Sequence, residues 1–305
     1  GILKHSSNVT GCALAIEEIF YEAGFTENLF RTVVVSSKKV GEIINNKNIA
    51  AITITGSVPA GKSVAEKAGS VLKKTVLELG GSDPYIILED ADLEQAAKAC
   101  VNSRLINAGQ SCIAAKRFII VESVYSEFER LFLENMNMKK MGDPFDEKND
   151  LGPQASVKLR DELHKQVELS IKKGAKLLMG GKIPKRKGAY YPPTILSNVK
   201  KGMPAYDDEL FGPVAALIKV KDEDEAVKVA NDTIFGLGAA VFTQDVKRGE
   251  EIAAKRLNAG CCFVNDFVKS DPRLPFGGIK ESGYGRELST FGIKEFVNIK
   301  TVYVK

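Results

Sequence analysis

Apolar residues along this chain recur at two spacings, one typical of helices and one typical of strands. The helical spacing predicts helices over residues 13–23, 40–45, 57–72, 93–105, 123–136, 159–172, 223–231 and 246–256. Alternating or continuous apolar runs predict strands over residues 30–36, 49–55, 75–79, 85–88, 118–121, 175–179, 194–196, 214–220, 238–242, 260–265 and 296–304. Strands that alternate with helices in this way predict an α/β fold built on a parallel sheet.

Three local features refine this prediction. The β-branched run 49–55 has the continuous apolar character of a strand buried on both faces. Ser123 stands where the N-cap of the helix 123–136 is expected. The strand 296–304 has nothing after it with which to pair, so we expect another subunit to cover it.

Composition narrows the functional classes. The chain has 305 residues, a net charge of +4 and no tryptophan, which argues against a nucleic-acid-binding surface. Apolar runs fall short of the ~20 residues that a membrane helix needs. Five cysteines do not form a disulfide framework in a chain of this length, so we expect a reducing, cytoplasmic setting. With only His5 and His164, neither a zinc site nor a Ser-His-Asp triad is expected.

One cysteine is a candidate nucleophile. Cys112 follows a Gly-Gln-Ser turn between a predicted helix and a predicted strand, and the cations Lys116 and Arg117 come shortly after it. Nearby cations lower a thiol pKa and so favour the reactive thiolate. Taken alone, the cysteine is also compatible with a small buried apolar residue.

Five motifs in a fixed order decide between these readings. They are Thr-Gly-Ser at 55–57, Glu-Leu-Gly-Gly at 78–81, Gly-Gln-Ser-Cys at 109–112, Glu-Leu-Phe-Gly-Pro at 209–213, and Pro-Phe-Gly-Gly at 275–278 followed by Ser-Gly at 282–283 and Gly-Arg-Glu at 285–287. Together they resemble the aldehyde dehydrogenase superfamily over the whole chain. Residues 3–5, 112–117 and 270–276 resemble the short bacterial succinate-semialdehyde dehydrogenase branch.

The resemblance implies a domain plan. Residues 1–79 would be the C-terminal part of a Rossmann-like dinucleotide-binding domain, and 80–280 an α/β catalytic domain. Residues 281–305 would supply a return helix and an oligomerisation strand, so a homodimer or homotetramer is expected. The first third of a typical member, including an asparagine that donates to the oxyanion, would lie before Gly1.

The resemblance also assigns the chemistry. Cys112 would add to an aldehyde carbon, and its backbone N–H would face the oxyanion. Hydride would leave to the nicotinamide, and Glu78 would activate the water that hydrolyses the thioester. Taken without Cys112, Glu78 is more simply interpreted as a surface charge at the end of a strand.

Cofactor residues follow from the same motifs. Gly56 and Ser57 stand between a strand and a helix N-terminus, where a phosphate binds well, although Ser57 is also an ordinary helix cap. The resemblance adds Leu79, the ribose-binding carboxylate Glu209 and Phe211 beside the nicotinamide. In isolation, a solvated acid and a core aromatic are the simpler readings of the last two.

The choice between NADP and NAD depends on Ser7. Lys4 resembles the lysine that contacts the adenosine ribose, and NAD-preferring members often carry a glutamate three residues later. That position is Ser7 here, which leaves room for a 2′-phosphate. We therefore predict NADP in preference to NAD.

Substrate residues are less specific. Lys269, Ser270, Arg273 and Phe276 are candidates to bind a semialdehyde with a far carboxylate, although solvated loop charge explains the two cations equally. Many succinate-semialdehyde enzymes place an arginine six residues before the cysteine, where this chain has Ile106. The alternative to an active enzyme is a truncated, inactive chain that acts only through association.

Overall fold

The computed structural model describes residues 1–305. The chain folds as two compact units, one made of residues 1–52 and 63–75 and the other of residues 53–62 and 76–305. The smaller unit holds β1 (Ile2–Leu3), α1 (Thr10–Glu22), β2 (Arg31–Thr32) and α2 (Val40–Asn45), with β1 and β2 paired in parallel. The predicted helices here are confirmed, whereas the strand predicted over 30–36 is only two residues long.

A three-stranded sheet has the order β12-β4-β3. It consists of β3 (Ala51–Thr55), β4 (Lys74–Glu78) and β12 (Gly283–Tyr284), and α3 (Val58–Gly69) follows β3. The residues of β4 change from exposed to buried along its length, and its last residue is Glu78. The strand therefore carries a carboxyl side chain into the interior of the larger unit.

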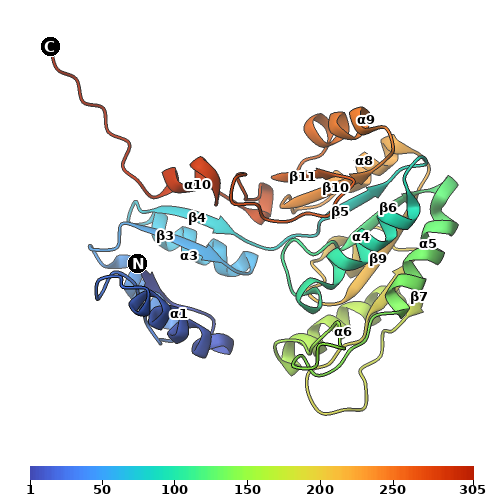
Figure 1. Ribbon diagram of the computed structural model, residues 1–305, viewed down its shortest axis with the longest axis horizontal. Helices are drawn as coiled ribbons and strands as arrows, with labels where there is room; N and C mark the ends of the chain where they lie inside the picture. The colour runs from blue at the N-terminus through green and yellow to red at the C-terminus, as the bar shows by residue number, and fades with distance from the viewer. The chain divides into compact units, whose positions relative to one another are not determined.

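The larger unit is organised around a seven-stranded sheet with the order β11-β10-β5-β6-β9-β8-β7 (Figure 1). Its strands are β5 (Pro84–Ile87), β6 (Arg117–Val121), β7 (Lys176–Met179), β8 (Thr194–Ser197), β9 (Val214–Val220), β10 (Gly238–Phe242) and β11 (Cys261–Val264). All neighbouring pairs are parallel except β7 with β8. The predicted α/β class with a parallel sheet is confirmed.

Helices cover both faces of this sheet (Figure 1). They are α4 (Leu93–Leu105), α5 (Glu122–Asn137), α6 (Val157–Lys172), α7 (Pro204–Asp207), α8 (Glu223–Asn231) and α9 (Val246–Glu251). A further helix near the C-terminus, α10 (Ser289–Glu295), has no buried residue and does not belong to this layer. One core cluster joins α4 and α5 to alternate residues of the strands, such as Tyr85 and Ile87. The other cluster joins α6, α7 and α8 to the intervening residues, such as Ile86 and Leu88. Side chains alternate across a strand, so burial on both faces requires the continuous apolar runs seen in the sequence.

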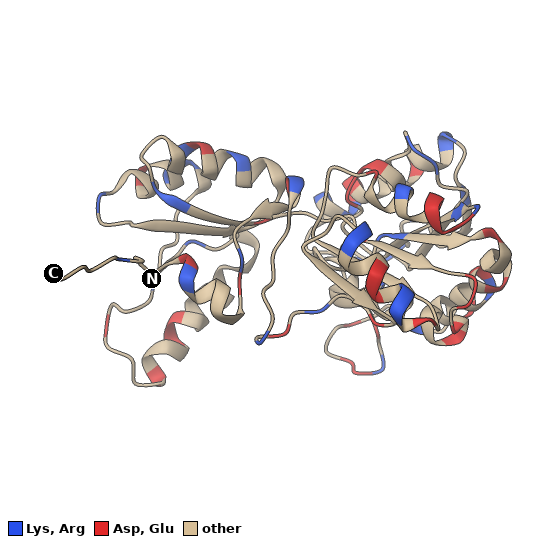
Figure 2. Cartoon of the chain, turned by 90° about the horizontal axis from the view of Figure 1, so that it is seen from above, with Lys and Arg blue, Asp and Glu red and all other residues tan.

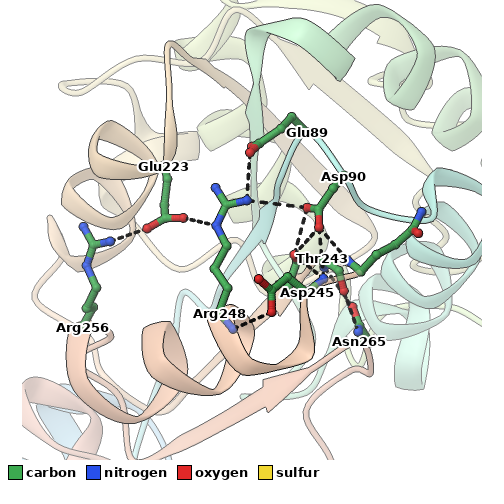
Figure 3. Close-up of polar contacts among 9 residues, drawn as sticks. Glu89, Asp90, Glu223, Thr243, Asp245, Arg248, Arg256 and Asn265 are labelled. Atoms are coloured by element: carbon green, nitrogen blue, oxygen red, sulfur yellow. Dashed lines mark hydrogen bonds and ion pairs between the residues drawn. The ribbon is translucent and has the colours of Figure 1, made fainter.

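A polar network ties α8 and α9 to the end of β5 (Figure 3). The Arg248 guanidinium pairs with Glu89 at 2.8 Å and with Glu223 at 2.5 Å, and Glu223 also pairs with Arg256. Asp90 accepts hydrogen bonds from the Thr243 hydroxyl at 2.7 and 2.8 Å. These contacts join segments that are far apart in the sequence. They hold the N-termini of α8 and α9 at the edge of the sheet formed by the carboxyl ends of its parallel strands.

Two sequence predictions are wrong in detail. The α5 helix begins at Glu122, and no side chain caps it, so Ser123 is not its N-cap. The strand β3 is only half-buried, with Thr53 and Thr55 exposed, because it lies at the edge of the three-stranded sheet. Residues 298–305 form no regular structure in the single chain, so the strand expected to pair there with another subunit stays a prediction.

Acidic and basic residues are interspersed along the backbone of both units (Figure 2). Most ion pairs are exposed, and several follow the i,i+3 or i,i+4 spacing of a helix, such as Arg130 with Glu127 and Glu134. None of the helices combines the length and the apolar character that crossing a membrane requires.

Candidate active site

The cysteine loop begins with an unusual backbone. After α4, residues Ile106–Gly109 form a short 3₁₀ turn in which Asn107, Ala108 and Gly109 all have positive φ. A Cβ on Gly109 would lie 2.2 Å from the backbone of Gly212, so only glycine fits there. The buried Arg104 guanidinium donates a hydrogen bond to the Gly109 carbonyl oxygen at 2.7 Å and so stabilises the turn from the interior.

The Cys112 thiol is half-buried in this loop. Burial raises its pKa to about 11, while the Lys116 ammonium and the Ile113 backbone N–H act in the opposite direction. The Lys116 ammonium donates to the carbonyl oxygens of Ser111 at 3.0 Å and of Cys112 at 2.8 Å. The nucleophile loop is therefore anchored from inside by a cation.

Glu78 is a buried carboxyl group without a hydrogen-bond partner. Its side chain is 3 % exposed, and neither carboxyl oxygen has a partner. Burial, followed by the nearby Glu287 carboxylate, raises its pKa to about 8, against a smaller opposing effect of Arg286. A carboxyl group that titrates near neutral pH is well suited to act as a general base.

Backbone packing brings Glu78 and the cysteine loop into the same region. Gly80 and Gly81 come shortly after Glu78 in an irregular segment, and a Cβ on Gly81 would lie 2.8 Å from the Cys112 carbonyl oxygen. On the other side, a Cβ on Gly277 would lie 2.8 Å from Glu78 Oε1. Three of the five sequence motifs therefore meet here, and the glycines permit the close approach.

Glu209 lies at the same junction. Its carboxylate accepts a hydrogen bond from the Gly81 N–H at 3.0 Å and lies 3.5 Å from the Lys116 ammonium. A Cβ on Gly80 would lie 2.4 Å from Glu209 Oε2. Phe211 follows in the chain with 41 % of its surface exposed, so it is not a core aromatic.

The Gly56 and Ser57 pair lies between β3 and α3, as the sequence predicted. The Gly56 N–H donates to the Glu78 carbonyl at 3.0 Å, and Leu79 is buried against Gly61 of α3. The first N–H groups of a helix have no partner within the helix, which makes this terminus able to bind a phosphate.

Lys4 and Ser7 belong to the smaller unit. Lys4 follows β1 and is half-buried, and Ser7 is exposed in a short 3₁₀ turn over Ser7–Val9. Their assignment to the cofactor stays a prediction.

The candidate substrate residues lie on the loop before the glycine-rich segment. Lys269 pairs with Asp266 at 2.5 Å, and Arg273 pairs with Asp271 at 2.5 Å, so both cations already have local partners. Ser270 is exposed. By contrast, Phe276 is buried, and its backbone is bridged to Glu287 at the base of the loop. Their role in substrate binding stays a prediction.

A group of buried charged residues was missed by the sequence reasoning. Asp83 accepts a hydrogen bond from the Gly238 N–H at 3.0 Å, and its other oxygen has no partner. Burial raises its pKa to about 6, an effect that Lys116 opposes. Arg117 donates to the carbonyl oxygens of Ser82 at 3.1 Å and of Val229 at 2.9 Å. The charged pair after Cys112 was the available signal, but charged residues are usually exposed.

No group of histidine, cysteine, aspartate and glutamate side chains in the structure could hold a metal ion. The donor set instead suits a nucleotide. The carboxyl oxygens of Glu209 can accept hydrogen bonds from ribose hydroxyls, and the α3 terminus at Ser57 offers N–H donors to phosphate.

Comparisons with known proteins identify the family of the chain. The aldehyde dehydrogenase family model matches residues 1–302. The chain is 50 % identical over 302 residues to the succinate semialdehyde dehydrogenase [NAD(P)+] Sad of Escherichia coli K12. This match covers 99 % of this chain and 65 % of that protein. It is 49 % identical over 304 residues to a probable NADP+ succinate-semialdehyde dehydrogenase of Synechocystis, covering 100 % and 67 %.

Among solved structures, it resembles the succinic semialdehyde dehydrogenase of Streptococcus pyogenes in complex with NADP+. The TM-score is 0.97 and the identity 40 %, over 99 % of this chain and 66 % of that one. The chain thus spans about two thirds of the length of these relatives, from 65 % to 67 %.

Proposed function

The chain belongs to the aldehyde dehydrogenase family, and on that premise we propose that it oxidises an aldehyde to a carboxylic acid with NAD(P)+. One observation carries the proposal. The unpartnered Glu78 carboxyl lies three residues before Gly81, whose backbone packs against the Cys112 carbonyl oxygen. A nucleophile and a base held by one backbone junction form the minimal machinery for covalent acyl chemistry.

The proposed reaction begins at Cys112. Its thiolate adds to the aldehyde carbon, and the carbonyl oxygen becomes an oxyanion that the Cys112 backbone N–H faces. Bound NAD(P)+ supplies the acceptor for the hydride, so the carbon is oxidised to a thioester. Glu78 then takes a proton from water, which attacks the thioester carbon, and the carbon–sulfur bond breaks to release the acid and restore the thiol.

Protonation states set the pH dependence. The Glu78 carboxyl, with its pKa raised to about 8, becomes a better base as the pH rises through 8. The Cys112 thiol, with its pKa raised to about 11, also gains thiolate over this range. Both changes predict that turnover increases from pH 6 to pH 9.

The cofactor proposal is NADP in preference to NAD. Glu209 would hold the ribose next to the nicotinamide, with Phe211 packed beside the ring, and Gly56, Ser57 and Leu79 would form the phosphate side. At the adenosine end, a neutral Ser7 near Lys4 does not repel a 2′-phosphate, whereas a carboxylate would. The NADP+ named for two of the relatives supports this choice.

Succinate semialdehyde is the proposed substrate, as named for the relatives above. Its far carboxylate would meet the loop of Lys269, Ser270 and Arg273, and Phe276 would line the apolar part. We further propose that the protein assembles as a homodimer or homotetramer through the exposed tail, in which Val302 and Val304 are 78 % and 85 % exposed.

The test is an aldehyde-dependent rise in absorbance at 340 nm with NADP, measured on this 305-residue chain and on a version extended to the relatives' full length. Cys112→Ser should abolish the rise, and Glu78→Gln should stop turnover after a burst of reduced cofactor. Glu94→Gln, on the surface of α4, is the matched control for Glu78. A steady rate in the Cys112→Ser variant would refute the proposal. An extended enzyme that is active beside an inactive 305-residue chain would instead support a purely associative role for this chain.

A further inference from the structure

Lys116 is a buried cation that has no role in the reaction proposed above. Its side chain is 1 % exposed, and its ammonium group has three acceptors within reach. These are the carbonyl oxygens of Ser111 at 3.0 Å and Cys112 at 2.8 Å, and Glu209 Oε1 at 3.5 Å. An ammonium group has three N–H donors, so one side chain satisfies the nucleophile loop and the carboxylate together.

The contacts join two parts of the site that carry different chemistry. Ser111 and Cys112 belong to the nucleophile loop, and Glu209 belongs to the segment that follows α7. Glu209 also accepts a hydrogen bond from the Gly81 N–H, three residues beyond the proposed base. Lys116 is therefore the cation that links the backbone of the nucleophile loop to the proposed ribose carboxylate.

Charged groups surround this link from several elements. Burial lowers the pKa of Lys116 and the nearby Arg104 acts in the same direction, whereas Glu209 and Asp83 favour the charged form. At the Cys112 thiol, Lys116 lowers the pKa, and Asp83 and Glu209 raise it. The Lys116 ammonium and the Glu209 carboxylate, which form one ion pair, therefore shift the pKa of the same thiol in opposite directions.

We propose that Lys116 is a positioning residue that fixes the backbone of Cys112 and couples thiolate formation there to the Glu209 carboxylate. The proposal deepens the function proposed above and rests on it for the roles of Cys112 and Glu209. When ribose hydroxyls engage Glu209, its pull on Lys116 weakens, and the ammonium then acts more fully on the thiolate. Occupation of the ribose subsite would in this way favour the nucleophile.

Alkylation of Cys112 by iodoacetamide tests the proposal without any turnover. The pH profile of labelling is measured on the 305-residue chain, with each of its five cysteines quantified by peptide mass spectrometry. Lys116→Met should move the Cys112 profile to higher pH by about one unit, which lowers labelling at pH 8 about tenfold. Glu209→Gln should move it to lower pH. Lys98→Met, on the exposed side of α4, is the matched control and should leave the profile in place.

A purely structural lysine would not produce opposite shifts of the Cys112 labelling profile in the Lys116→Met and Glu209→Gln variants. Labelling of the fully buried Cys100 reports unfolding, so a variant in which Cys100 reacts is set aside. If Lys116→Met unfolds, Glu209→Gln and the charge-conserving Lys116→Arg carry the test, and Lys116→Arg should keep the wild-type profile. An unchanged profile in a folded Lys116→Met chain, or an upward shift with Glu209→Gln, would overturn the proposal.

Failure of the proposed function would look different. A chain that does not oxidise aldehydes but shows the two opposite shifts would retain the coupling between Lys116 and Cys112. A chain that turns over normally with a flat labelling response would refute the coupling alone.

Discussion

Replacing Glu78 by glutamine should make the larger unit more stable, and only at neutral to alkaline pH. The carboxyl is 3 % exposed and has no hydrogen-bond partner. In the folded chain its pKa is raised from 4.5 to about 8. Below pH 4.5 the carboxyl is neutral in both the folded and the unfolded chain, so it has no electrostatic cost.

The sign of the effect follows from proton linkage. Between pH 4.5 and 8 the unfolded chain releases the Glu78 proton and the folded chain retains it, so the free energy of unfolding falls as the pH rises. At 1.36 kcal/mol for each pKa unit, the full loss approaches about 5 kcal/mol above pH 8. Glutamine cannot ionise, so the Glu78→Gln variant escapes this loss.

Urea unfolding of both proteins at pH 4.5, 6.5 and 8.5 measures the effect. The two should differ little at pH 4.5, and the variant should be more stable by about 4 kcal/mol at pH 8.5. Glu94→Gln, at an exposed position of α4, is the control and should show no such trend. An equal stability difference at every pH would refute the reasoning, because the unpaired glutamine amide alone contributes a term that does not depend on pH.

Three further changes test other parts of the fold. Gly109→Ala places a Cβ 2.2 Å from the backbone of Gly212 at a φ of +77°, and should cost about 3 kcal/mol in thermal or urea unfolding; a cost below 1 kcal/mol contradicts the packing. Arg248→Met removes the ion pairs of Arg248 with Glu89 and Glu223, and the pair with Glu89 lowers the pKa of Glu89. The loss of about 1 kcal/mol at pH 7 should shrink below pH 4 as the carboxylate protonates, and a pH-independent loss argues against the pair. Deleting residues 296–305 should reduce the mass of the assembly in light scattering, and an unchanged mass excludes the tail as the contact.

Hydrophobic pattern was sufficient to predict most of the elements. The ranges of α2, α4, α8, β9 and β10 match the prediction, because each combines a clear period with a turn or cap at its ends. Prediction was weaker at edges. The strand expected over 30–36 is short, and the tail is not a strand in the single chain, because a strand exists only where a partner accepts its hydrogen bonds.

The sequence by itself determined the order of the motifs, the parallel α/β class and the choice of Cys112 and Glu78 as candidates. It did so because the motifs are local and the apolar periods are local. Only the tertiary structure decided which charged residues are buried. In the sequence, Asp83 is an ordinary polar residue and Lys116 is only a cation near the cysteine. Both become interior groups once β4, the cysteine loop and the segment at Glu209 converge. Burial and the neighbours it brings arise from contacts between distant segments, and those contacts set the pKa of the nucleophile and of the base.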